Sequence, residues 1–342
     1  MIYFLTTRKH RYTMDVCLRT DGKQLTSRVQ MMSYGHLFLQ KRLPVGVYIF
    51  ADNERLDDKD RERAAFVWDQ LDADGRSRLL NHPTRVLKRY PLLRKLHDLG
   101  INQFNVHRLT DCEVPERFPV FIRGENDHRG ARTDLIQNRS ELDDALAEID
   151  RTWKARTGKI FTEFCDVSDG DGVYRKYSCF RIGKKILPRH LFFRNEWEVK
   201  GWERLDPHLL EEEREFYRKN PHADELRKIF DLAGIDFGRI DYGLAEGKIQ
   251  VWEINTNPLL PVPHGGGGPA RQPLHDAFNQ KFISVFEELD ESVVVDGESV
   301  ELHRPAIDWW NVGRIPAEII YRRFSRGSRS SRQGDDSALQ VA

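Results

Sequence analysis

The stretch from Arg239 to Pro258, RIDYGLAEGKIQVWEINTNP, constrains this chain most. It predicts two short strands joined by a turn, with Asp241 on the first strand. Glu253 and Asn255 lie two residues apart on the second strand and therefore share a face. Because a buried carboxylate needs a partner, these oxygen ligands favour a hard cation, and beside a phosphate the usual cation is Mg²⁺. Taken alone, the stretch also fits an ordinary hairpin with charged edges.

Composition narrows the class of protein. The 342 residues and a hydrophobic share of 39% suit a compact enzyme of two or three lobes. Lys plus Arg equals Asp plus Glu, 54 each, so net charge argues for neither a nucleic-acid nor a membrane partner. The four cysteines show no metal-binding spacing and predict reduced thiols of a cytoplasmic protein. The N-terminal run predicts neither a signal peptide nor a membrane span, and the oligomeric state stays open.

Strand and helix patterns alternate and then give way to a strand-rich block, which predicts an α+β fold with an α/β leading part. Gly100 ends an expected helix that begins at residue 84, with Pro91 predicting a kink or restart. Ser140 is the expected cap of the next helix. Strands are expected at 1–5, 45–52, 101–109, 118–124, 159–167, 173–183 and 184–193. Further helices are expected at 58–75, 208–220, 223–234 and 276–290.

The pattern of Asp241, then a dozen residues, then Glu253-x-Asn255 with Pro258 shortly after, resembles the metal-binding signature of the ATP-grasp superfamily. That family includes glutathione synthetase, D-alanine–D-alanine ligase and the ribosomal-protein glutamate ligases. The resemblance implies an ATP-grasp fold, in which two α+β lobes clamp the nucleotide, with ATP and Mg²⁺ as cofactors. It implies a leading α/β domain over 1–80, an ATP-grasp domain over 81–295, and a C-terminal extension over 296–342 with a disordered tail.

The resemblance also implies two basic residues on the phosphates. Arg89, with Lys88 beside it, precedes the LHDLGI turn, and Arg123 ends the strand that begins at Pro119. The family usually has Lys at both places, and an Arg fork also binds phosphate oxygens. Both could instead be surface arginines. The following GENDHRGAR run, with His128 and Arg129, corresponds to the family's phosphate-covering loop, although a generic polar loop fits the same residues.

The segment IFTEFCDVSDGDG resembles the hinge that reads adenine through the backbone. Glu163 matches the first acid of this hinge, and Phe164 and Cys165 follow it. The acid that holds the ribose is left open among three aspartates. These are Asp166, Asp169 and Asp171. A plain strand followed by an acidic turn is the alternative.

Two further arginines are candidates for the catalytic group that meets the acceptor or the transferred phosphate, Arg175 in YRKY and Arg189 in LPRH. The implied activity is a ligase that activates a carboxylate as an acyl phosphate and joins it to an amine or a similar nucleophile, on small-molecule or peptide substrates. A small-molecule kinase and a non-catalytic nucleotide-binding module are the alternatives. The glycine run at 264–268 is expected to be an anion-binding loop or a linker, because no GxSxG elbow supports an esterase.

Overall fold

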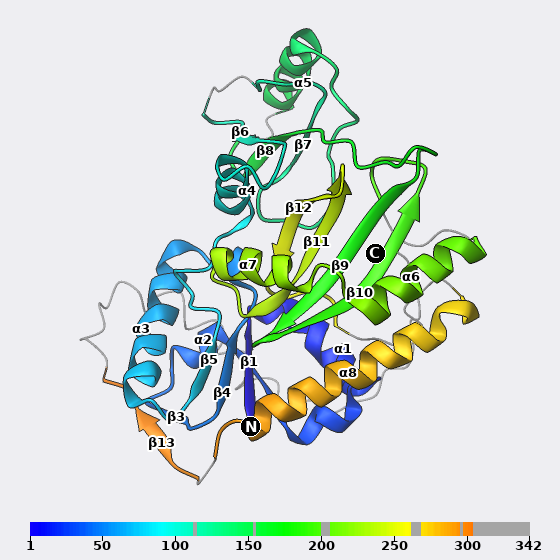
Figure 1. Ribbon diagram of the computed structural model, residues 1–342. Helices are drawn as coiled ribbons and strands as arrows, with labels where there is room; N and C mark the ends of the chain where they lie inside the picture. Colours follow the sequence, from blue (N-terminus) through cyan, green and yellow to red (C-terminus); the bar gives the residue numbers. More distant parts are fainter. Residues whose placement is uncertain (112–114, 153–154, 200–205, 261–267, 295–296, 304–342) are drawn as a thin grey trace, which may run out of the picture.

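The computed structural model describes residues 1–111, 115–152, 155–199, 206–260, 268–294 and 297–303. Within these ranges the chain forms a parallel sheet near the N-terminus and two antiparallel sheets above it, each packed with helices (Figure 1). This arrangement confirms the predicted α+β class with an α/β leading part. No helix in the described part of the chain is long and apolar enough to cross a membrane. Most of the tail expected to be disordered, and most of the glycine run at 264–268, lie outside the described residues.

The leading domain is built on a parallel sheet in the order β2-β1-β4-β5. Its central strands β1 and β4 are buried along their whole length and are almost entirely apolar, as expected for a parallel sheet covered on both faces. The strands are β1 (Ile2–Thr6), β2 (Val29–Ser33), β4 (Val47–Phe50) and β5 (Arg78–Leu80). The helical segments are η1 (Arg8–His10), α1 (Tyr12–Arg19), η2 (Lys23–Ser27), α2 (Tyr34–Leu37), η3 (Asn53–Arg55) and α3 (Asp58–Asp74). The expected helix at 58–75 is thus present, capped by Asp57 and ended by Gly75 in the left-handed region.

A three-stranded antiparallel sheet in the order β6-β8-β7 forms the upper lobe in Figure 1. Its strands are β6 (Val106–Arg108), β7 (Val120–Gly124) and β8 (Lys159–Glu163), with helices α4 (Arg89–Asp98) and α5 (Arg139–Arg151). Two local expectations were wrong. Helix α4 begins only at Arg89, so Pro91 lies in its first turn, where the missing N–H has no cost and no kink results. Asn138, not Ser140, caps α5, accepting from the Glu141 N–H at 3.1 Å while its amide donates to the Glu141 carboxylate.

The four-stranded antiparallel sheet β10-β9-β11-β12 lies between the upper lobe and the leading domain (Figure 1). Its strands are β9 (Tyr174–Ile182), β10 (Lys185–Arg194), β11 (Phe237–Ala245) and β12 (Lys248–Asn255). Helices α6 (Pro207–Lys219) and α7 (Ala223–Ala233) bury apolar residues against one face. On the opposite face, His190, Ser178, Asp241 and Glu253 stand side by side in register across the four strands. The predicted hairpin is therefore present and presents its acids on the face that α6 and α7 leave open.

Helix α8 (Gln272–Glu291) joins the four-stranded sheet, called the middle sheet below, to the leading domain. Its aromatic side chains Phe278, Phe282 and Phe286 share one core with strands β1 and β4 and with Phe180 of β9. After it, β13 (Ser299–Glu301) pairs with β3 (Arg42–Pro44) of the leading domain. The described part of the expected C-terminal extension therefore folds back on the leading domain.

The junction between the leading domain and the middle sheet depends on Asn81, which is fully buried and has a positive φ of 68°. Its side-chain oxygen accepts from the backbone N–H groups of Asp236 and Phe237 at 2.7 and 2.9 Å, and its amide donates to the Phe237 carbonyl at 2.7 Å. One side chain thus satisfies three backbone groups where β11 begins.

We expect Asn81→Gly to keep the left-handed backbone and lose all three hydrogen bonds, lowering the free energy of unfolding by about 2–4 kcal/mol. Urea denaturation measures the change. Glu246→Gly is the matched control, because Glu246 also has a positive φ but is exposed. An Asn81→Gly protein as stable as that control would show that the junction does not depend on this side chain.

Candidate functional site

A cavity of about 190 Å³ lies between the three-stranded and the four-stranded sheet. Its walls are largely aromatic, and the Trp197 ring packs against Phe121 and Phe164 at centroid distances of 4.9 and 6.1 Å. Its inner end is polar and includes Arg123, Lys176, Asp241 and Glu253. A chamber with aromatic walls at one end and charged groups at the other suits a ligand with a ring at one end and an anion at the other.

The predicted hinge residues lie on this cavity, but Glu163 does not use its carboxylate there. That carboxylate is buried and accepts from the Asn105 N–H at 3.0 Å and from the Arg117 guanidinium at 3.2 Å. Phe164 and Cys165 line the cavity, and the Phe164 N–H donates to the Pro119 carbonyl at 2.8 Å. Glu163 therefore anchors the hinge, whose next two residues face the ligand space.

Thr162 is a cavity residue whose side chain has no hydrogen-bond partner among the described residues. Its hydroxyl is buried and makes no hydrogen bond, although the residue lines the cavity. Because an unpaired buried hydroxyl is costly, a polar group of a ligand is its natural partner.

The structure leaves the choice of ribose acid unresolved. Asp166 and Asp171 are exposed and do not line the cavity. Asp169 accepts from the backbone of its own turn and pairs with Arg175 at 2.5 Å, so its charge is already used. Glu198, which follows β10, is the acid that lines the aromatic end, and it accepts from the Ala131 N–H at 2.8 Å.

Glu253 is the centre of the charged end. Arg89 and Arg123 both donate to its Oε2 atom, Arg123 at 3.0 Å, and the His128 ring lies 3.5 Å from Oε1. Burial raises the pKa of Glu253, but the Arg89 charge and the His128 hydrogen bond outweigh burial and hold the pKa well below its usual range. Burial, aided by Arg89, lowers the pKa of Arg123 to about 10. The predicted phosphate residues Arg89 and Arg123 and the predicted metal ligand Glu253 are therefore brought together.

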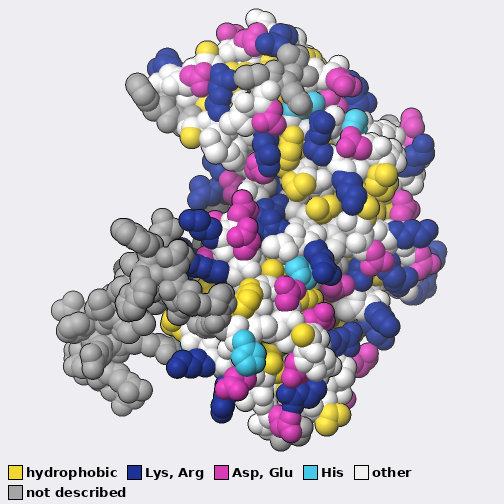
Figure 2. Space-filling model, turned by 90° about the vertical axis from the view of Figure 1, so that its left-hand side faces the viewer, with side chains coloured by type: hydrophobic (Ala, Val, Ile, Leu, Met, Phe, Trp, Pro, Cys, Tyr) yellow, Lys and Arg dark blue, Asp and Glu magenta, His cyan; other side chains and the backbone are white. Residues whose placement is uncertain are grey.

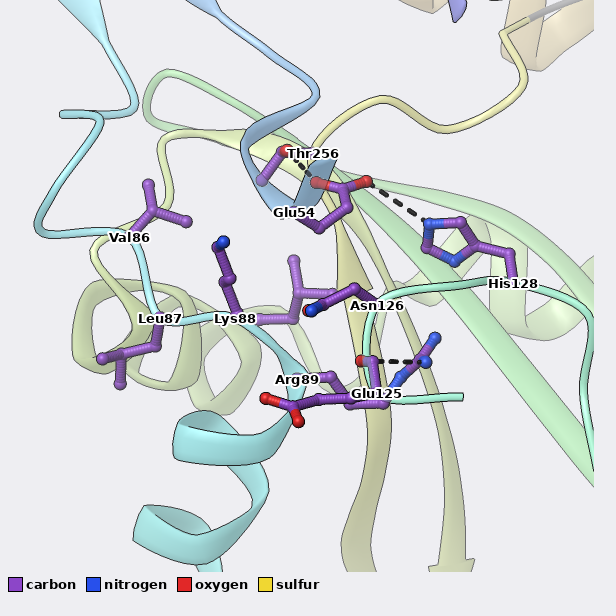
Figure 3. A pocket seen from close by; sticks show the side chains of 10 residues that line it. Glu54, Val86, Leu87, Lys88, Arg89, Glu125, Asn126, His128 and Thr256 are labelled. Atoms are coloured by element: carbon purple, nitrogen blue, oxygen red, sulfur yellow. Dashed lines mark hydrogen bonds and ion pairs between the residues drawn. The ribbon is translucent and has the colours of Figure 1, made fainter. Parts of the chain in front are cut away.

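Arg89 also holds the loop that follows β7. Its Nη1 atom donates to the carbonyls of Gly124, Glu125 and Asp127 at 2.7, 3.2 and 2.7 Å. Figure 3 shows Arg89 beneath this loop, next to Glu125. Lys88 does not join Arg89, because its ammonium donates to the Leu56 carbonyl at 2.8 Å.

The leading domain closes this end of the site through Glu54 of η3. In Figure 3 its carboxylate lies between His128 and Thr256. His128 Nε2 is 3.3 Å from Glu54 Oε1, and the Thr256 hydroxyl donates to the other oxygen. Although burial lowers the pKa of His128, its bonds to Glu253 and Glu54 raise it to about 8. His128 thus connects the loop, β12 and the leading domain.

Asp241 faces the cavity from β11, opposite Glu253 in register. Ser178 and Arg239 hydrogen-bond to Asp241, the Arg239 Nε atom at 2.9 Å, and the Lys176 ammonium lies 4.0 Å from Oδ2. Burial lowers the pKa of Lys176. Asn255 is buried, and its side-chain oxygen accepts from the Asn257 N–H at 2.8 Å.

The expected metal set is chemically suited to Mg²⁺. Among the described residues no three His, Cys, Asp or Glu side chains are grouped to hold a metal ion. The expected set instead contains two carboxylates and one amide, all oxygen donors of the kind that a hard cation prefers. Asp241 and Glu253 stand opposite each other on adjacent strands and are both within the charged end of the cavity. The donor atoms therefore suit Mg²⁺. In the structure, Arg239 pairs with Asp241 and Arg123 pairs with Glu253.

The two candidate catalytic arginines are placed differently. Arg175 lies on the face of β9 that is covered by α6, where it pairs with Glu212 at 2.7 Å. It does not reach the cavity, whereas its neighbours Tyr174 and Lys176 line it, because successive side chains of a strand point to opposite faces. Arg189 lies on the open face, and its guanidinium stacks over Phe278 at 4.6 Å.

Sequence analysis missed Lys176, Arg239 and Glu54 as parts of this site. Alternation gave a signal for the first two, since Arg239 is two residues before Asp241 and Lys176 is two before Ser178. Glu54 gave no signal, because only the tertiary fold brings η3 to the loop after β7.

Comparison with known proteins gives likenesses of structure only. No protein-family model matches the chain, and no curated protein matches its sequence. Solved structures with a similar fold include a D-alanine–D-alanine ligase from Bacillus anthracis in complex with ATP, at 12% identity and a TM-score of 0.49, covering 85% of this chain and 98% of that one. An L-amino acid ligase from Bacillus licheniformis is 14% identical, with a TM-score of 0.41 and coverage of 85% and 75%.

A RimK domain protein of the ATP-grasp type from Sphaerobacter thermophilus is 10% identical, with a TM-score of 0.46 and coverage of 85% and 100%. The expected likeness to ATP-grasp proteins is thus found among solved structures. At these identities and TM-scores it carries no argument about activity.

The opposite placement of two neighbouring residues is directly testable. We expect Lys176→Met to weaken nucleotide binding about tenfold, the value of one partly buried charge-assisted contact, and Arg175→Met to change it less than twofold. Isothermal titration with a non-hydrolysable ATP analogue measures both. If both variants lose the same affinity for the ATP analogue, the placement of Lys176 and Arg175 on opposite faces of β9 does not determine binding.

Proposed function

We propose that this protein is an ATP- and Mg²⁺-dependent ligase of the ATP-grasp type, which activates a carboxylate as an acyl phosphate and joins it to an amine. The observation that carries this proposal is the charged end of the cavity. There Arg89, Arg123 and Lys176 converge on the acids Asp241 and Glu253 next to an aromatic chamber. A nucleotide triphosphate with its metal ion has this combination of ring, anion and cation.

Each part of the cavity has a role in holding ATP. The base would lie between Phe121, Trp197 and Trp252, with the backbone after Glu163 at its edge. The phosphates would take the donors of Arg123 and Lys176, and the loop from Gly124 would cover them. Asp241, Glu253 and Asn255 would hold Mg²⁺, which would neutralise negative charge on the phosphate oxygens during transfer of the terminal phosphoryl group.

The chain's own residues then position and neutralise rather than react covalently. Arg239, fixed by Asp241, would meet the substrate carboxylate as it approaches the terminal phosphate, and its charge would stabilise the anion that forms in transfer. Burial of Arg123 and Lys176 strengthens their interaction with phosphate, because water no longer screens the charges. The amine then attacks the acyl phosphate, phosphate leaves, and no protein nucleophile is needed.

Nucleotide binding is the first test. We expect Mg-ATP or a non-hydrolysable analogue to raise the melting temperature, because a ligand that binds only the native state stabilises it. Arg123→Ala should weaken binding by about 1.5–3 kcal/mol, roughly ten- to a hundredfold, and Arg218→Ala, an exposed arginine of α6, should not. If no nucleotide changes the melting temperature of the parent protein, this proposal loses its basis.

Turnover is the second test. Phosphate release should occur with Mg-ATP only when a pool of carboxylates and a pool of amines are both present, and Glu253→Gln should abolish it while leaving the far-UV circular dichroism unchanged. ADP formed together with a phosphorylated acceptor would identify a kinase instead. Nucleotide binding without any turnover would identify a binding module.

A further inference from the structure

A group of basic residues extends along the same sheet face, from Lys176 at the charged end of the cavity to residues that do not line the cavity. We call it the basic cluster. It comes from β9, β10, β11 and η4 (Pro269–Arg271), and the bulge in β10 between Pro188 and His190 brings two of its members to one place. Its members are Lys176, Arg189, His190, Arg239 and Arg271.

The acids available to this cluster are fewer than its cations. Arg271, which is almost fully buried, pairs with Glu213 of α6, and Arg239 pairs with Asp241. Lys176 is 4.0 Å from Asp241, which it shares with Arg239. Four permanent cations therefore face two carboxylates among the described residues.

Arg189 is the cation that lacks an acid. No carboxylate of the described residues lies within ion-pair distance of it. Its guanidinium stacks on Phe278 at 4.6 Å and donates through Nη1 to His275 Nδ1 at 3.1 Å, so that nitrogen of His275 carries no proton. An aromatic face and a neutral imidazole compensate a half-buried guanidinium less than a carboxylate does.

The surroundings of Phe192, at the centre of the basic cluster, show the same shortage of acids. The Lys176 ammonium and the Arg271 guanidinium lie 5.2 and 6.0 Å from its ring centre, and the His190 ring stacks on it at 3.8 Å. Burial together with Arg239 and Arg189 holds the pKa of His190 well below its usual range, so the imidazole stays neutral. The face thus carries more permanent positive charge than the two carboxylates Asp241 and Glu213 balance.

We propose that the basic cluster binds a second anionic group of the carboxylate substrate, so that the substrate of this ligase belongs to the class of dicarboxylic acids. This inference rests on the proposed function for the position of the reacting carboxylate, beside Arg239. Arg189 then takes the far carboxylate, because a guanidinium without an acid partner offers a fork that matches it. Binding there supplies the charge that the sheet face lacks.

The alternative role of Arg189 is contact with the transferred phosphate alone. The two roles differ in what its loss does. A phosphate contact would lower turnover of every carboxylate equally, whereas a site for a second anion would remove the preference for diacids over monoacids.

The test compares diacids with monoacids of equal carbon number: malonate with propionate, succinate with butyrate, and glutarate with valerate. Binding is measured by isothermal titration at constant ionic strength, with and without Mg²⁺ and a non-hydrolysable ATP analogue. We expect at least one diacid to bind the parent protein tenfold or more tightly than its monoacid. Arg189→Met should reduce that ratio below twofold, Arg189→Lys should keep part of it, and the exposed Arg218→Met should leave it unchanged.

Two results would overturn the inference: no diacid preference in the parent protein, or the same preference in Arg189→Met. Arg189→Lys keeps the charge and so separates a loss of binding from a loss of folding, which the melting temperature reports for each variant. The titrations without nucleotide test the anion site independently of the proposed function. A protein that prefers a diacid but binds no nucleotide would contradict the proposed function and leave the anion site intact.

Discussion

The carboxylate of Glu253 is the group on which the arrangement of the site depends. It stands on β12, at the edge of the four-stranded sheet, and is approached by Arg89 from α4, Arg123 from β7 and His128 from the following loop. These three residues belong to the upper lobe, whereas Glu253 belongs to the middle sheet. A buried anion is tolerated only when such charges compensate it. One acid therefore joins the two sheets that enclose the cavity at its charged end, beside the apolar core that they share.

The same acid also links the leading domain to the cavity. His128 touches Glu253 on one side and Glu54 on the other, and Thr256, three residues beyond Glu253, donates to Glu54. His128 thus joins the loop that follows β7 both to β12, through Glu253, and to the leading domain, through Glu54. If a metal ion took the Glu253 oxygens, the cations that now surround them would be released toward the phosphates. This exchange of partners would couple metal binding to phosphate binding without any change of fold.

Local pattern was enough to predict the elements of the site, but not which side chains meet in it. The hairpin with Asp241, Glu253 and Asn255 was predictable because period-two alternation fixes the shared face. Arg175 was predicted from the family resemblance. The YRKY run alone does not reveal which face of β9 is covered by α6, and a shift of one residue reverses every side chain. Asn138 and Ser140 are both good caps, and the backbone of α5 selects between them.

The distribution of charge in space is the feature that could least be predicted from the sequence. The chain as a whole is neutral, with 54 residues of each sign. On the surface that Figure 2 displays, basic and acidic side chains are interspersed. Yet the open face of the middle sheet separates the two signs over a few residues, with Glu253 enclosed by cations at one end and Arg189 without an acid at the other. Such a separation stores electrostatic energy that a correctly shaped anion can recover. Under the proposed function, substrate specificity would depend on where this compensation is missing as much as on where contacts are made.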